Sequence, residues 1–240
     1  DDEIDELSHA LFGRMYEQSL RETRGLTLVK CGPCHETATF ITNDWDRVRD
    51  ETLEGVTCVY CHFVAGPGTE TGVPPFALDI SQFVGTIRLP ATVKDHKSAY
   101  SAYIKSSEYC GGCHKYSNQN GVLISDTIGE WKRSKYPKLG ITCQGCHMPG
   151  GAGRNSTMGP IRPRVANHAF EISNSNPKLR GALTLKLLPG PRAKDSLRVF
   201  AVVANVGAGH SMPTGNDQHV LVVRVRATDS KGKILWENDP

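Results

Sequence analysis

The chain has 240 residues, a formal net charge of +3, and 22% charged and 38% hydrophobic residues. No stretch approaches 18 consecutive apolar residues, so we expect no membrane-spanning helix, and no dense basic run with interleaved aromatic residues predicts nucleic-acid binding. The 24 Gly and 14 Pro indicate many loops around a thin apolar core.

Residues 3–23 are predicted to form a helix that is apolar on two faces. The first stripe contains Ile4, Leu7, Leu11 and Met15, and the second contains His9, Phe12, Tyr16 and Leu20. At 100° per residue the two stripes are centred about 140° apart around the helix axis. A helix with this pattern packs against neighbours on two sides.

Four Cys-x-x-Cys-His motifs follow, and together they use every cysteine of the chain. They are Cys31-Gly32-Pro33-Cys34-His35, Cys58-Val59-Tyr60-Cys61-His62, Cys110-Gly111-Gly112-Cys113-His114 and Cys143-Gln144-Gly145-Cys146-His147. This pattern is the attachment signature of c-type haem: two thiols bond the vinyl groups and the adjacent His supplies one axial nitrogen to the iron. The sequence therefore predicts four covalently bound haem c groups, with proximal ligands His35, His62, His114 and His147.

Other uses of paired cysteines explain the pattern less well. Disulfides and structural zinc sites do not require a His directly after each pair, and a thioredoxin-like motif would occur once. Four haem groups would also supply apolar surface that a thin core lacks. We expect the motifs themselves to sit on short helices.

The segments between and after the motifs show both loop and helix signals. Gly66-Pro67-Gly68 and Pro74-Pro75 indicate loop. Residues 95–109 are predicted as a helix with Asp and Ser as start signals, and residues 121–136 as a helix that contains Trp131. Residues 148–164 are rich in Gly and Pro and are expected to be irregular.

From about residue 180 the apolar period changes from helical to alternating. Four strands are expected, around Leu183–Leu187, Leu197–Val203, Val220–Arg226 and Ile234–Trp236. The predicted fold class is therefore mostly loop and short α-helices around four covalent haems, a multihaem cytochrome, with a small C-terminal antiparallel β module. The expected domains are residues 1–178 for the haem-binding part and 179–240 for the β module. Four strands make a thin sheet, which leaves open whether the chain is complete at Pro240.

Five histidines remain as candidate distal ligands: His9, His96, His168, His210 and His219. The sequence favours His9, His96, His168 and His210, because each lies on a helix, near an aromatic residue or in a Gly/Pro loop that could aim its ring at a haem. His219 opens a predicted strand, where it could be a plain surface residue or the fourth ligand in place of His9. Met15, Met148, Met158 and Met212 are weaker alternatives, since His/His ligation needs no thioether.

Three segments resemble a broad family of multihaem c-type cytochromes that includes the tetrahaem electron carrier of hydroxylamine oxidation. They are Ser106–His114, Glu130–Ser134 and Cys143–Pro149. The loop Gly209-His210-Ser211-Met212-Pro213-Thr214-Gly215 is similar to that of members with a C-terminal β module. Four motifs with a short β tail are most similar to tetrahaem cytochromes that polymerise into extracellular nanowires, of the outer-membrane cytochrome E type. Met212 stands where this likeness leads us to expect a larger aromatic residue.

The resemblance implies electron transfer through bis-histidine haems, with His96, His168 and His210 as distal ligands. It also implies a homo-oligomeric filament in which a His, here His9, is shared between subunits. Redox proteins or extracellular acceptors would be the partners. Alternatives are a soluble periplasmic shuttle and, less favoured, a nitrogen oxide reductase with one open haem; catalysis is not expected.

Covalent haem is attached outside the cytoplasm in prokaryotes, so we expect an extracellular or cell-surface protein, or a periplasmic one. The start Asp1-Asp2-Glu3 is typical of a mature terminus left after signal removal. Asn155-Ser156-Thr157 is a glycosylation sequon in the predicted irregular segment, and its use stays open.

Overall fold

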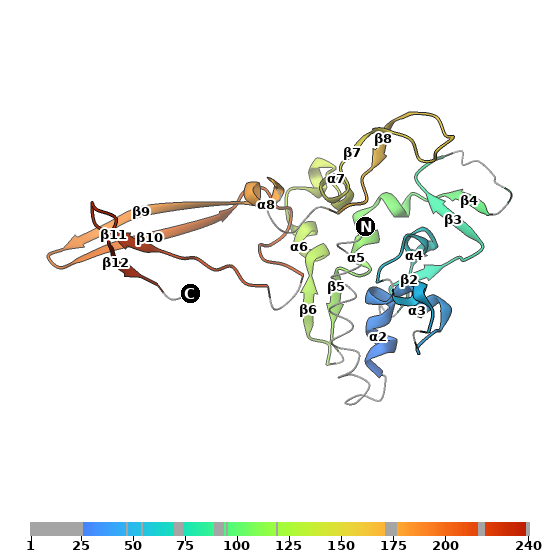
Figure 1. Ribbon diagram of the computed structural model, residues 1–240, viewed down its shortest axis with the longest axis horizontal. Coiled ribbons are helices and arrows are strands. Elements are labelled where there is room, and N and C mark those ends of the chain that lie inside the picture. Colours follow the sequence, from blue (N-terminus) through green and yellow to red (C-terminus); the bar gives the residue numbers. More distant parts are fainter. Residues whose placement is uncertain are drawn as a thin grey trace.

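The computed structural model describes residues 26–46, 48–53, 55–69, 74–88, 94, 96–118, 120–170, 177–215 and 219–238. The predicted helix 3–23, with His9 and Met15, lies outside these residues. Helices and short sheets gather at one end of the molecule, and a long β-hairpin projects from them (Figure 1). Within the described residues, no helix has the length and apolar character needed to cross a membrane.

Three of the four motifs lie entirely on short helices, as the sequence predicts, and the third begins on one. These are α2 (Leu26–His35), α4 (Cys58–His62), α5 (Ser107–Gly111) and α7 (Cys143–His147). Helices α4 and α7 begin after a threonine whose hydroxyl accepts a backbone N–H in the first turn of the helix: Thr57 from Tyr60 at 3.3 Å, and Thr142 from Gly145 at 3.3 Å. The third motif differs, because α5 ends at Gly111 and the rest of the motif forms a turn.

The remaining helices are short and connect the motifs. They are α3 (Thr37–Thr42), η1 (Asp50–Leu53), η2 (Tyr103–Lys105), α6 (Thr127–Arg133), η3 (Pro137–Leu139) and α8 (Pro177–Ala182). The predicted helix 121–136 is too long, since the run from Leu123 to Asp126 is strand β6 and α6 starts only at Thr127. Trp131 lies in α6 as predicted.

The predicted helix 95–109 is wrong in its first part and is not one continuous helix. Lys97–Tyr100 forms strand β4, which pairs in parallel with β3 (Gln82–Gly85), and η2 and α5 follow it separately. The segment forms a strand because its backbone pairs with the edge of β3. Such a pairing is invisible in the local signals that suggested a helix start.

The described strands form six two-stranded sheets, and none of those outside the C-terminal module was expected. In addition to β3–β4 they are β1 (Val64–Pro67) with β2 (Phe76–Leu78), β5 (Lys115–Ser117) with β6, β7 (Gly150–Gly153) with β8 (Arg162–Ala166), β9 (Leu183–Ala193) with β10 (Ser196–Asn205), and β11 (Arg226–Thr228) with β12 (Ile234–Glu237). Two loop predictions are thereby corrected: Gly66 and Pro67 belong to β1, and part of 148–164 belongs to the β7–β8 hairpin.

The β module confirms three of the four predicted strands. Strands β9 and β10 are antiparallel, as are β11 and β12. The predicted strand Val220–Arg226 is wrong, since only Arg226 is in a strand. The preceding backbone is instead held by one side chain, because Asn238 accepts from the Val225 N–H at 2.5 Å and donates to the Val223 carbonyl at 2.8 Å.

The described hydrophobic core is small and lies between the second and third motifs. Tyr60, Val64 and Phe76 form its buried centre. Around them pack Phe40, Ile41, Leu78, Tyr103, Tyr109 and Cys113. The core therefore contains Tyr60 of the second motif and Cys113 of the third. The packing of this core and the placement of the two motifs are thus linked.

Candidate functional site

Thiols of different motifs lie next to one another. Cys34 and Cys113 are in hydrogen-bond contact, and this contact lowers the pKa of Cys34 and raises that of Cys113. Cys110 and Cys143 are in the same relation, and the contact lowers the pKa of Cys143 and raises that of Cys110. No disulfide joins any of the eight cysteines. The third motif thus lies beside both the first and the fourth.

Two proximal histidines each lie next to a predicted distal histidine. The ring centres of His62 and His168 are 6.3 Å apart, and those of His147 and His210 are 6.1 Å apart. Metal–nitrogen bonds of about 2.0–2.1 Å, with about 1.2 Å from nitrogen to ring centre, would place two imidazoles that share one metal ion about 6.4 Å apart. Both spacings therefore suit a single iron held between two rings.

Backbone carbonyls orient three of these four rings. His62 Nδ1 is 2.7 Å from the Val84 oxygen, His168 Nδ1 is 3.1 Å from the Ala166 oxygen, and His210 Nδ1 is 2.9 Å from the Ser211 oxygen. Since a carbonyl only accepts, each Nδ1 carries the proton, and Nε2 is the nitrogen with a lone pair for a metal. Metal-ligating histidines show this arrangement as a rule.

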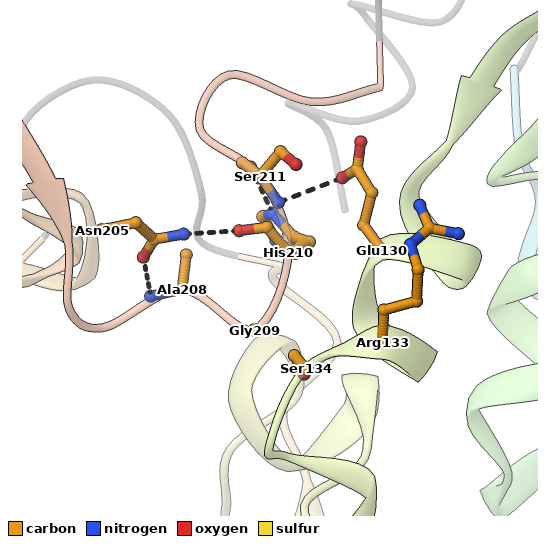
Figure 2. A pocket seen from close by; sticks show the side chains of 8 residues that line it. All are labelled: Glu130, Arg133, Ser134, Asn205, Ala208, Gly209, His210 and Ser211. Atoms are coloured by element: carbon orange, nitrogen blue, oxygen red, sulfur yellow. Dashed lines mark hydrogen bonds between the residues drawn. The ribbon is translucent and has the colours of Figure 1, made fainter.

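His210 lies in the loop after β10, which is fastened to both neighbouring elements (Figure 2). Asn205 at the end of β10 donates to the His210 carbonyl at 2.6 Å and accepts from the Ala208 N–H at 3.0 Å. On the other side, the Glu130 carboxylate of α6 accepts from the Ser211 N–H at 3.1 Å and from the Thr214 hydroxyl at 2.6 Å. Residues of this loop and of α6 line a shallow, open pocket of about 330 Å³ beside His210.

The other candidate ligands are placed differently. His96 is exposed, and its ring meets the Phe83 ring edge-on with centres 4.8 Å apart. Phe83 directly precedes Val84, whose carbonyl orients His62. His219 is exposed, and its Nδ1 is 2.9 Å from the Thr214 oxygen. Among the described residues, no ring contact joins either of them to a proximal histidine. Met158 is 93% exposed at the surface.

Several observations test whether the residues fit haem. Every motif has two cysteines outside any disulfide, on or beside a helix, with its His directly after the second. Tyr60, inside the second motif, is 1% exposed and its hydroxyl has no hydrogen-bond partner in the described part of the chain. No three His, Cys, Asp or Glu side chains converge on one point in that part. A porphyrin iron needs only two axial ligands from the protein. The His62–His168 and His147–His210 pairs would supply them, so the residues of the second and fourth motifs fit a haem.

Sequence reasoning missed the residues that hold the ligands in place. Asn205 is the last residue of a strand, and Asn side chains commonly bond the backbone of a following turn. That residue type in that position was the signal that could have identified it. Glu130 was noted only through the family resemblance, and its bonds to the His210 loop join residues far apart in sequence.

A scan against protein-family models, a search of curated proteins and a search of solved structures each gave no match.

Proposed function

We propose that this chain is a tetrahaem c-type cytochrome that transfers electrons. The single observation that carries the proposal is that the His of two Cys-x-x-Cys-His motifs lies next to a second imidazole, with ring centres 6.3 Å and 6.1 Å apart. When bound, the haem iron supplies a one-electron ferric/ferrous couple. The cysteines of the four motifs would hold the four groups, with His35, His62, His114 and His147 as proximal ligands.

His168 and His210 would be the distal partners of His62 and His147. The carbonyls of Ala166 and Ser211 fix which nitrogen faces the metal, so neither ring has to reorganise when the iron changes charge. His96 is proposed as a third distal ligand and His9 as a fourth, with His219 as the alternative to His9. Two imidazoles per iron leave no open position for a substrate, which favours electron transfer over catalysis.

The finer proposal is that copies of the chain assemble into an extracellular conductive filament, with an axial His shared between neighbours. Its support is the resemblance of the motifs and of the Gly209–Gly215 loop to filament-forming tetrahaem cytochromes. An extracellular or cell-surface location follows from that role, and a soluble periplasmic carrier is the alternative. Redox proteins or extracellular acceptors would receive the electrons.

A pyridine haemochrome assay on the purified protein tests the cofactor. Four haems per polypeptide are expected, and fewer than four would overturn the proposal. Electron paramagnetic resonance of the oxidised protein is expected to show low-spin ferric signals only, since every iron has two imidazoles. A strong high-spin signal would favour the reductase. Negative-stain microscopy separates filament from carrier, because uniform globules at high concentration would contradict assembly.

A further inference from the structure

Helix α5 is bound to the second motif through Tyr109, the residue directly before Cys110 of the third motif. The Tyr109 hydroxyl donates to the Cys61 carbonyl at 2.9 Å. The Tyr109 ring stacks on Phe76 at 5.4 Å between centres, and Phe76 meets Tyr60 edge-on at 6.1 Å. Burial raises the pKa of Tyr109, so its hydroxyl stays protonated and can donate. Two residues of motif 2, Tyr60 and Cys61, are thereby held against α5.

The same helix is bound to the fourth motif at its first residue. The Ser107 hydroxyl accepts from the Cys143 N–H at 3.1 Å, and Ser107 is only 1% exposed. Next to it, the Gln144 side chain donates to the carbonyls of Ile104 at 3.1 Å and Ser106 at 2.8 Å. The first two residues of motif 4 are thus fixed to the segment that leads into α5.

The two glycines of the third motif allow this packing. A Cβ on Gly112 would lie 2.5 Å from Cζ of the buried Phe76 ring, and a Cβ on Gly111 would lie 2.8 Å from Cγ1 of the buried Ile128. Any larger residue would therefore push the third motif away from β2 or from α6. The middle residues of the other three motifs include side chains, such as Pro33, Tyr60 and Gln144.

We propose that α5 is the junction that sets the spacing of the second, third and fourth haem-attachment motifs, with Tyr109 and Ser107 as its positioning residues. This inference rests on the proposed electron-transfer function. Electron tunnelling falls off exponentially with the distance between centres, so a bond that holds two attachment sites in place affects the exchange rate between them. Each hydroxyl fixes a different pair: Tyr109 the second and third sites, Ser107 the third and fourth.

The test uses the haem-loaded protein with Tyr109→Phe, Ser107→Ala and both changes together. Tyr116→Phe and Ser117→Ala, which alter exposed side chains of β5, are the matched controls. After pulse reduction, electron equilibration among the haems is followed optically. We expect it to slow severalfold in each single variant and further in the double variant, while the controls match the wild type and haem number and low-spin signals stay unchanged.

Equilibration at the wild-type rate in variants that are merely less stable would overturn the proposal, because the two hydroxyls would then only stabilise the fold. If Ser107→Ala takes up fewer than four haems, Gln144→Met removes the neighbouring link from the motif 4 side, and its rate decides in the same way. Failure of the proposed function is distinguishable, since the wild type itself would then carry fewer than four haems.

Discussion

The imidazole rings of His147 and His210 lie 6.1 Å apart with their planes inclined by 16°. His147 ends helix α7, whereas His210 belongs to the loop that follows β10. The proposed boundary at residue 179 therefore separates two halves of one candidate site. The β module is part of that site, since its first long loop carries a ring to the fourth motif.

Removal of the His210 ring is expected to change the spin state of one iron. On the proposed assignment, the cysteines and His147 would still hold the haem in His210→Ala, so four haems per chain would remain, but one iron would lose its second imidazole and become high-spin. Electron paramagnetic resonance measures the change as a new high-spin signal from one centre in four. His210→Met keeps a ligand and should stay low-spin with one raised reduction potential. An unaltered spectrum in His210→Ala would contradict the assignment.

Loss of the Glu130 carboxylate is expected to loosen the loop that carries His210. Glu130→Ala removes an acceptor used by the Ser211 N–H and the Thr214 hydroxyl, and hydrogen bonds to charged groups contribute about 1.5–3 kcal/mol when buried. The site is partly exposed, so we expect a loss of about 1–2 kcal/mol in the free energy of unfolding, measured by denaturant titration. Glu108→Ala is the control: it breaks a half-exposed ion pair with Lys132 and should cost below about 0.5 kcal/mol. Equal losses in the two variants would contradict the anchoring role.

The attachment helices could be predicted because their signals are local. Cysteine pairs with an adjacent His define each motif, and Thr57 and Thr142 cap two of the helices one residue before the first cysteine. The hairpin β9–β10 was predictable for the same reason, since its apolar residues alternate over a long run. Strand β4 was missed, because it forms only against β3, which no local pattern in residues 97–100 reveals.

The same difference between local and long-range signals applies to the candidate site. His168 and His210 were predicted as distal ligands from their residue type and neighbours, and both lie beside a proximal ring; ligation itself stays a prediction. Which proximal ring each one faces could not be read from the sequence, because it depends on how distant segments fold together. The carbonyls that orient the rings, such as that of Val84, carry no side-chain signal at all.

The third motif is expected to tolerate no side chain at Gly112. In Gly112→Ala the new Cβ would lie 2.5 Å from Cζ of the Phe76 ring, which is 5% exposed and cannot move aside freely. Overpacking of this kind costs about 1–3 kcal/mol. Gly151→Ala is the matched control, because no atom lies within 4 Å of the position its new methyl group would take and the residue is exposed. Denaturant titration of both holoproteins measures the difference; equal stability would show that the ring moves without cost.

Low pH is expected to destabilise the turn that follows β2, because the Asp79 carboxylate becomes protonated. Its carboxylate accepts from the Ser81 hydroxyl at 2.6 Å, from the Ser81 N–H at 3.0 Å and from the Gln82 amide at 2.6 Å, and these bonds lower its pKa below 3.8. A group whose folded pKa is depressed contributes stability that is present above the unfolded value and is lost as the pH falls through the folded one.

The wild type should therefore lose stability below pH 3.8 more steeply than Asp79→Asn, which has no charge to lose at this position. Melting temperatures of the holoproteins across this range measure the two slopes. Asp195→Asn, in the exposed turn between β9 and β10, removes one carboxylate elsewhere and is the matched control. Parallel curves for wild type and Asp79→Asn would contradict the prediction. Because the Asp79 N–H also donates to the Phe63 carbonyl at 2.8 Å, directly after His62, loss of the turn should first disturb the second motif.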